Sequence, residues 1–430
     1  MQKLSISEPD FAKKFQRIVC SRRETDANVQ SQVRDILHEV KARGDDALSA
    51  YSMRFDGYAL SDDSDWMITR EACEQAFQDC TPELRAALEL AAQRIRAYHE
   101  DQLPAGRDFT DAAGVRQGAI WRAVDAAGLY VPGGRAAYPS SLLMNAIPAR
   151  VAGVERLVVM TPTPKGEVNP LVLAAAHLAG VDEIWRLGGA HSVAALAYGT
   201  ETIAAVDVIT GPGNAYVAEA KRQLYGVVGI DMVAGPSEIL VIADKDNDPD
   251  WIASDLLSQA EHDPAAQSIL ITDDAGFAAL VEDCVNVQSA QLATSRTTQA
   301  SWNEHGVIIV VDELAQASEL ANDLAPEHVE LAVAEPEPFL ESIRHAGSIF
   351  LGRMTPEAIG DYVAGPNHVL PTGRRARFAS GLSVLDFMKR TSFIELDDKA
   401  LDAIGPAAVE LAYAEGLPAH AHSVERRLKR

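Results

Sequence analysis

The feature that most constrains this fold is a repeated alternation of short β-branched runs with stretches of helical period. From Gly128 onward, the runs "VERLVVMTP", "DEIWRLGG" and "VDVITGPGN" each precede a helical stretch. Successive strand–helix units predict parallel strands, because parallel neighbours need a crossover connection that is usually a helix. A second series begins at Glu238 and predicts a second parallel sheet; its runs are "EILVIAD", "SILITDD", "GVIIVVD", "VELAVAE" and "SIFLG".

The two ends of the chain have a different pattern. Up to about Gln102, apolar residues recur at three- and four-residue spacing, and after about Gly381 the pattern is again mostly helical. The predicted fold class is therefore α/β, with two parallel sheets between helical ends.

Composition excludes several kinds of partner. The 62 acidic residues outnumber the 38 basic ones, and the formal net charge of −24 would repel a polyanionic backbone. No stretch approaches the roughly 20 apolar residues of a membrane span, and the first residues contain no apolar leader. We therefore expect a cytoplasmic protein that binds neither nucleic acid nor a membrane.

A metal site in this chain would need histidine, carboxylate or amide ligands, because the cysteines form no Cys-x-x-Cys pair and no Cys/His cluster. The stretch "LLSQAEHDP" places Gln259 and His262 three residues apart on one face of a predicted helix. This pair is either a solvated helix face or half of a metal site, since two ligands do not complete a zinc site. Further donors are Asp361 in "PEAIGDYVAGPNHVLP" and Glu415 and His420 in "AEGLPAHAHS", each also compatible with a polar loop.

Two neighbouring polar residues begin the run "EHVELAVAE". Glu327 and His328 would point to opposite faces of a regular strand. Both can serve one site only if the strand starts irregularly after Pro326, and the alternative is a strand start with one solvated polar residue.

Three glycine loops suit either phosphate binding or plain tight turns. They lie at 131–134, 187–190 and 211–214, and the last two stand directly between a predicted strand and helix. Backbone N–H groups at such turns can approach a phosphate. None of the loops is a G-x-G-x-x-G with an acid about 20 residues later, so the strict dinucleotide signature is absent.

Eight ordered motifs resemble the histidinol dehydrogenase family. The resemblance extends from about "VKARGDDALSAYSMRFD" to His420 and is far more specific than any single motif. The motifs are "GLYVPGGRAAYPSSLLMNAIPA", "GPGNAYVAEAKRQ", "IDMVAGPSEILVIAD", "SDLLSQAEHD", "APEHVEL", "GSIFLG", "IGDYVAGPNHVLPT" and "AEGLPAH".

The resemblance implies a zinc- and NAD-dependent enzyme that oxidises L-histidinol to L-histidinal and then to L-histidine, the last step of histidine biosynthesis, and reduces two NAD. Carried over by motif, the zinc ligands are Gln259, His262, Asp361 and His420. The substrate pocket adds Ser237, His328 and Glu415 to these four residues. His328 is implied as the general base for the hydroxyl, and Glu327 as the residue that activates water for the second oxidation.

The resemblance also assigns the NAD contacts to Tyr130, His191 and Asn214. The family usually has glutamine in the "GGAQ" turn, whereas this chain has His191. An imidazole there can form hydrogen bonds but adds a possible charge, which puts NAD affinity and its pH dependence in question.

Family architecture implies two incomplete Rossmann-like domains in a homodimer. We expect residues 1–24 to form an N-terminal helical extension, residues 25–129 with 238–380 to form the domain carrying most of the zinc and substrate site, and residues 130–237 to form the NAD domain. The helical tail of residues 381–430 is expected to exchange between subunits.

Three alternatives come from other readings of the same residues. A family relative could oxidise another alcohol such as a sulfonated diol, but the carboxylate of Glu415 suits a cationic amine better than a sulfonate. A pyridoxal phosphate enzyme would need a Schiff-base lysine, and neither Lys221 nor Lys389 stands in a setting that marks one. An inactive homologue would have lost Glu327 or His328, and both are present.

Overall fold

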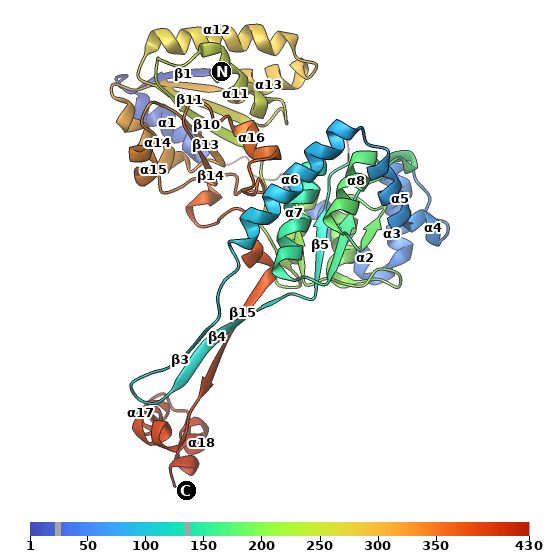
Figure 1. Cartoon of the computed structure of the whole chain (residues 1–430), viewed down its shortest axis with the longest axis vertical. Helices are drawn as coiled ribbons and strands as arrows, with labels where there is room; N and C mark the ends of the chain where they lie inside the picture. Colours follow the sequence, from blue (N-terminus) through green and yellow to red (C-terminus); the bar gives the residue numbers. More distant parts are fainter. Residues whose placement is uncertain (22–26, 134–137, 430) are drawn as a thin grey trace.

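The computed structural model describes residues 1–21, 27–133 and 138–429. Two α/β units lie side by side, and a long antiparallel arm leaves the second unit and ends in two helices (Figure 1). The predicted α/β class with two parallel sheets and helical ends is confirmed. None of the helices in the described ranges has the length and apolarity that a membrane crossing needs.

The first sheet has six strands, and every pair of adjacent strands in it is parallel. In spatial order its strands are β1 (Gln2–Ser5), β12 (Val307–Val310), β11 (Gln267–Thr272), β10 (Glu238–Ala243), β13 (His328–Ala332) and β14 (Ser348–Leu351). The central strands are apolar along almost their whole length because helices cover both faces of the sheet. One face packs against α11 (Pro249–Ala260), α12 (Ala275–Gln291) and α13 (Ser295–His305), and the other against α1 (Phe11–Cys20) and α14 (Ala317–Leu324).

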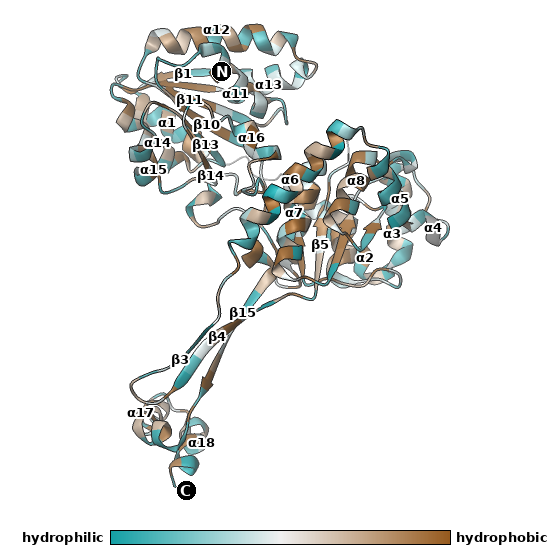
Figure 2. Ribbon diagram, in the orientation of Figure 1, coloured by the Kyte–Doolittle hydropathy of each residue, from teal (hydrophilic) through white to brown (hydrophobic). Residues whose placement is uncertain are grey.

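The second sheet also has six strands, of which only the short edge strand β2 is antiparallel. In spatial order its strands are β2 (Met67–Ile68), β7 (Glu183–Trp185), β6 (Arg156–Met160), β5 (Ala126–Tyr130), β8 (Val208–Thr210) and β9 (Gly229–Ile230). One face packs against α5 (Arg70–Gln78), α6 (Pro82–Glu100), α7 (Pro139–Ala152) and α8 (Pro170–Ala179). The other face packs against α2 (Ala27–Arg43), α3 (Asp45–Asp56), α9 (Gly189–Tyr198) and α10 (Ala215–Leu224). In Figure 2 the central strands of both sheets are coloured mostly as hydrophobic.

Several helices that follow strands begin at short polar side chains. At the start of α11, the Asp248 side chain accepts a hydrogen bond from the Asp250 N–H at 2.9 Å, and Pro249 occupies the first turn. At the start of α10, Asn214 accepts from the N–H groups of Tyr216 and Val217. These caps fix where each helix leaves its sheet.

The arm consists of a three-stranded antiparallel sheet. Its strands are β3 (Arg107–Thr110), β4 (Arg116–Ala123) and β15 (Met388–Glu395), and it leads to α17 (Asp398–Ala414) and α18 (Pro418–Leu428). In Figure 1 these two helices lie at the far end of the molecule from the first sheet.

The structure differs from the expected division of the chain in three places. Within residues 25–129, β2 and β5 join the sheet of the expected NAD domain, and α2, α3, α5 and α6 pack on it. The segment 1–24 begins with β1, which pairs with β12 at the edge of the first sheet, and the tail contains β15 as well as helices. The spacing of hydrophobic residues predicts whether a segment is a helix or a strand, but not which sheet it joins. This explains the three differences.

Candidate functional site

Four predicted site residues meet where β10 and β13 begin, at the centre of the first sheet. His328 is the first residue of β13, and Glu327 immediately precedes it. The last turn of α11 brings Gln259 to this place, and α16 (Glu357–Tyr362) brings Asp361. Ligands of open parallel sheets usually bind at the carboxyl ends of strands, whereas these side chains gather at the amino ends. The carboxyl end of α11 lies here too, and its partial negative charge favours a cation.

The imidazole of His328 has close neighbours at both ring nitrogens. Its Nδ1 lies 3.0 Å from the carbonyl oxygen of Glu238 and 3.0 Å from the amide nitrogen of Gln259. Because a carbonyl oxygen only accepts, a bond to Glu238 puts the hydrogen on Nδ1 and leaves Nε2 with its lone pair; the Gln259 amide nitrogen, itself a donor, then makes no hydrogen bond to Nδ1. Burial lowers the pKa of His328 to about 4, although the Asp361 carboxyl acts in the opposite direction. The ring is therefore neutral at neutral pH.

Glu327 shares this site because β13 begins only at His328. Its Oε2 accepts the backbone N–H of Glu238 at 2.9 Å and lies 3.7 Å from Nδ1 of His328. Glu327 and His328 are both buried and β13 starts only after Glu327, so the alternative of a strand start with one solvated polar residue does not apply. Burial raises the pKa of Glu327 well above its usual range, and the Glu238 N–H opposes that rise.

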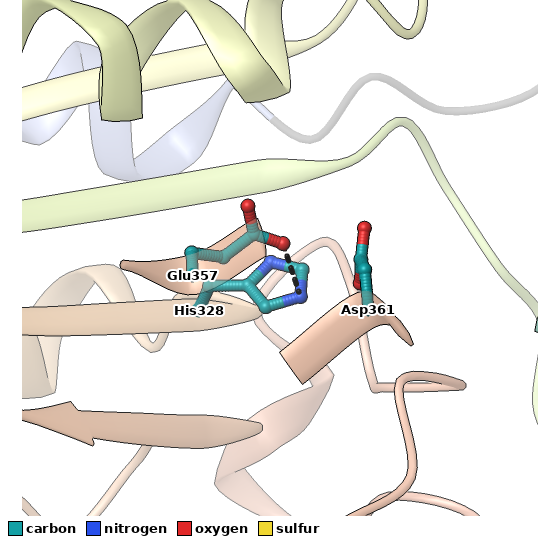
Figure 3. Close-up of side chains that lie close together, drawn as sticks. All are labelled: His328, Glu357 and Asp361. Carbon is teal, nitrogen blue, oxygen red and sulfur yellow. Dashed lines mark ion pairs between the residues drawn. The ribbon is translucent and has the colours of Figure 1, made fainter. Parts of the chain in front are cut away.

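Two carboxyls from one turn of α16 approach the same imidazole. Figure 3 shows His328 between the side chains of Glu357 and Asp361. Oε1 of Glu357 lies 3.5 Å from Nε2 of His328, and Oδ1 of Asp361 lies 3.4 Å from Nδ1 of His368. Burial raises the pKa of Glu357 to about 8. Burial also acts to raise the pKa of Asp361, but the hydrogen bond to His368 and the nearby imidazoles lower it overall.

A second pair of acids is buried behind this group. Glu330 of β13 accepts the backbone N–H of Glu357 at 3.3 Å, and its carboxyl is hydrogen-bonded to that of Asp255 in α11. Burial raises the pKa of both carboxyls, that of Glu330 to about 9, and the charge of Asp255 adds to the effect on Glu330. A hydrogen bond between two carboxyls needs one proton, so this pair holds a proton at neutral pH.

The residues present fit a divalent cation. Ligand atoms of His328, Glu357 and Asp361 all lie within 4.8 Å of one another. Oε1 of Gln259, Nε2 of His328 and Oε1 of Glu357 are buried, and none has a hydrogen-bond partner within the described ranges. Nitrogen and oxygen donors of this kind suit zinc and other borderline or hard divalent ions. His262 follows α11, is exposed, and lies close enough for its charge to affect the pKa values of His328 and Asp361.

A cavity of about 340 Å³ opens beside this group. Its lining includes His328, Phe350, Asp361, Asn367 and His368. A cavity of this size suits a small organic ligand held by a few polar groups. Ser237 directly precedes β10, next to Glu238, and is not among the residues that line the cavity.

The remaining predicted residues of the metal and substrate site lie elsewhere in the chain. Glu415 ends α17 and His420 lies in the first turn of α18, both exposed on the tail beyond the arm. Within one chain, the structure therefore does not bring His420 or Glu415 to Gln259 and Asp361 (Figure 1).

The predicted NAD residues lie at the carboxyl ends of the strands in the second sheet. Tyr130 ends β5, and its hydroxyl accepts the backbone N–H of Gly189 at 3.1 Å. Thr163 Oγ1, Thr210 Oγ1 and both ring nitrogens of His191 are buried in this unit without a hydrogen-bond partner in the part of the chain that the structure describes. Such orphaned polar atoms fit a polar ligand. Of the first glycine loop, Gly134 lies outside the described residues.

His191 does not add the charge that the sequence suggested. Its ring packs 5.6 Å from that of Tyr51 and 5.9 Å from that of Phe55. Burial lowers the pKa of His191 to about 3, so the imidazole is neutral at physiological pH. We therefore no longer expect it to make NAD affinity depend on pH near neutrality.

The two lysines weighed for pyridoxal phosphate occupy other settings. Lys221 is buried in an ion pair with Asp231, and Lys389 is exposed on β15 of the arm.

Sequence reasoning missed Glu357, His368 and Glu330. Glu357 stands four residues before Asp361, a spacing that places both on one helix face. This spacing could have predicted that Glu357 joins the site. His368 lies in the same motif as Asp361. The sequence does not predict that Glu330 is buried. An acidic residue within an apolar strand run normally faces solvent, and only the cover of both sheet faces by helices buries this one.

Comparisons with known proteins agree on one family. The family model described as histidinol dehydrogenase matches residues 20–428. The chain is 59% identical to a histidinol dehydrogenase of Zymomonas mobilis and 60% identical to one of Rhodospirillum rubrum, in each case over 100% of this chain and 99% of the relative. The crystal structure of histidinol dehydrogenase from Elizabethkingia anophelis superposes with a TM-score of 0.94 at 35% identity, covering 100% of this chain and 98% of that one.

The raised pKa of Glu330 in the Asp255–Glu330 pair makes the free energy of unfolding depend on pH. The folded-state pKa of Glu330 is raised above its ordinary value of 4.5, so the stability it contributes is complete below that value and is lost as pH rises toward about 9. Glu330→Gln keeps the shape and cannot ionise. Relative to wild type, this variant should become progressively more stable between about pH 5 and about pH 8, measured as the free energy of urea unfolding.

The exposed Glu335 offers a matched control on the same chain segment. Glu335→Gln should show a constant stability difference from wild type over that range. A constant difference for Glu330→Gln as well would contradict the raised pKa.

Proposed function

We infer the function from family and site together: the chain belongs to the histidinol dehydrogenase family, and we propose that it oxidises L-histidinol through L-histidinal to L-histidine while two NAD are reduced. The observation that supports this most is the group formed by buried Gln259, Glu327 and His328 with half-buried Asp361 beside one cavity. We also propose a cytoplasmic location, because the four cysteines are free thiols, as is usual in a reducing compartment.

His328 is suited to take the hydroxyl proton in the first oxidation. Its Nδ1–H is fixed by the Glu238 carbonyl, so the lone pair of Nε2 faces the group formed by Glu357 and Asp361. Loss of the hydroxyl proton to Nε2 leaves an alkoxide, from which a hydride can depart to NAD. Bound beside the substrate, NAD would supply the hydride acceptor in both oxidations.

Glu327 is suited to the second oxidation. The aldehyde must add water before another hydride can leave, and a carboxylate with a raised pKa is a stronger base toward that water. Its position 3.7 Å from the His328 ring lets both groups act on one bound molecule. The site is buried, which excludes bulk water from a reactive amino aldehyde.

We propose that zinc is held by Gln259, His262 and Asp361 together with His420. Bound there, zinc would position the imidazole and amine of the substrate. The unpartnered Oε1 of Gln259 and the closeness of His262 to Asp361 support this set. Ser237, His328 and Glu415 would complete the substrate pocket, with the Glu415 carboxylate facing the cationic amine.

The exposed tail supports a homodimer in which His420 and Glu415 come from the partner subunit. The arm carries α17 and α18 away from the first sheet, and both residues are exposed there (Figure 1). Large apolar side chains are exposed on the arm and tail, and their cover by a second copy would remove them from water, which supports the proposal. They are Ile394, Leu396, Ile404, Leu411, Tyr413 and Leu417.

We propose that NAD binds where β5, β6 and β8 end, with contacts from Tyr130, His191 and Asn214. The orphaned polar atoms of Thr163, Thr210 and His191 support a ligand there. An alternative substrate, another primary alcohol, is not favoured, because the full-length relatives in these comparisons are named histidinol dehydrogenase.

The proposed roles predict different losses for the two oxidations. Wild type should form two NADH for each histidine. His328→Asn should slow histidinol oxidation by about 10²–10⁴-fold, the usual loss for a general base. Glu327→Gln should slow histidinal oxidation more than histidinol oxidation. NADH absorbance and product analysis measure both steps, and wild-type rates of histidinol oxidation in both variants would contradict these roles.

The dimer proposal predicts recovery of activity by mixing two inactive variants. His262→Ala and His420→Ala should each be nearly inactive alone. Refolded together at equal amounts, they should regain about a quarter of wild-type activity, because half of the dimers are mixed and each mixed dimer has one intact site. Wild-type protein refolded in parallel is the control. No recovery, despite good refolding of the control, would place all four ligands on one chain.

A further inference from the structure

A buried ion pair in the second unit lies outside the reaction described so far. Lys221 of α10 and Asp231, which follows β9, pair with side-chain exposures of only 2% and 1%. Burying two charges costs so much solvation that apolar residues of similar size often stabilise a fold equally well. Stability alone therefore does not account for this pair.

Both charges also bind the main chain of a single glycine. Nζ of Lys221 donates to the Gly211 carbonyl at 2.9 Å, and the Gly211 N–H donates to Oδ2 of Asp231 at 2.9 Å. The other carboxylate oxygen of Asp231 accepts the N–H of Met232 at 2.6 Å. The pair thus fixes both polar groups of Gly211 at once, which two apolar side chains cannot do.

Gly211 holds a position that other residues cannot adopt. Its φ is +109°, and a Cβ built on it would lie 2.2 Å from the Tyr130 carbonyl oxygen. It opens the loop 211–214, which ends at Asn214, the cap of α10. The ion pair anchors the first residue of this loop against the end of β5, and the cap anchors the last.

We propose that Lys221 and Asp231 are positioning residues that hold loop 211–214 in the conformation that binds the dinucleotide. This inference rests on the proposed function, which assigns Tyr130 and Asn214 to NAD. The polar atoms of both side chains are already bonded to each other and to the main chain of Gly211 and Met232, so the pair acts through Gly211. If the loop without them adopted its binding conformation only about a tenth of the time, the apparent Kd for NAD would rise about tenfold.

Two double variants separate positioning from general stability. Lys221→Gln with Asp231→Asn removes both charges but keeps a donor and an acceptor for Gly211. Lys221→Met with Asp231→Leu removes the hydrogen bonds as well. Isothermal titration calorimetry of NAD with the zinc-loaded full chain should show near wild-type affinity for the polar pair and about tenfold weaker affinity for the apolar pair. The Kd for histidinol should stay unchanged in both.

Arg43→Met is the matched control, because it breaks an exposed ion pair with Glu39 in the same unit and should leave the Kd for NAD unchanged. Wild-type NAD affinity in a folded apolar pair, or equal weakening in both double variants, would overturn the positioning role. If the apolar pair does not fold, Asp231→Ala alone, which removes the acceptor for the Gly211 N–H, should weaken NAD binding several-fold, and unchanged affinity would overturn the proposal. Absence of NAD binding in wild type would instead contradict the proposed function.

Discussion

Burial of charge around His328 is the constraint on which the rest of the site depends. Glu327, Glu330 and Glu357 are buried beside one imidazole, and burial raises the pKa of each carboxyl. Burying an ionised carboxylate without a positive partner is costly, so such groups either hold protons or face a cation. The need to neutralise buried negative charge explains both the proton held by the Asp255–Glu330 pair and the fit of the site to a divalent ion.

The two sheets use their ends differently. The first gathers its acids and imidazoles at the amino ends of β10 and β13, where the carboxyl end of α11 favours positive charge. The second presents glycine turns and the start of α10 at the carboxyl ends of its strands, where backbone N–H groups favour negative charge. The proposed cation and the proposed dinucleotide would therefore be matched to opposite strand ends of the two sheets.

The local hydrophobic pattern of the sequence predicted most strands and helices, but not which sheet each of them joins. The strand runs from Gly128 and Glu238 became strands of two largely parallel sheets, most of them central, because continuous apolar runs need cover on both faces. The two-residue strand β2 and the edge strand β1 joined sheets that no period could indicate. Likewise, Gln259 and Asp361 were predictable from motifs, whereas the burial that neutralises His191 and raises the pKa of Glu330 depends on neighbours distant in sequence.

We propose that each metal site combines Gln259, His262 and Asp361 of one chain with His420 of the partner subunit. Crystals grown with zinc, measured on both sides of the zinc absorption edge, would locate the ion directly by anomalous difference density. The account predicts one peak per subunit, within ligand distance of these four side chains from two chains. A peak bound by His328, Glu357 and Asp361 instead, or a site whose His420 comes from the same chain, would contradict it.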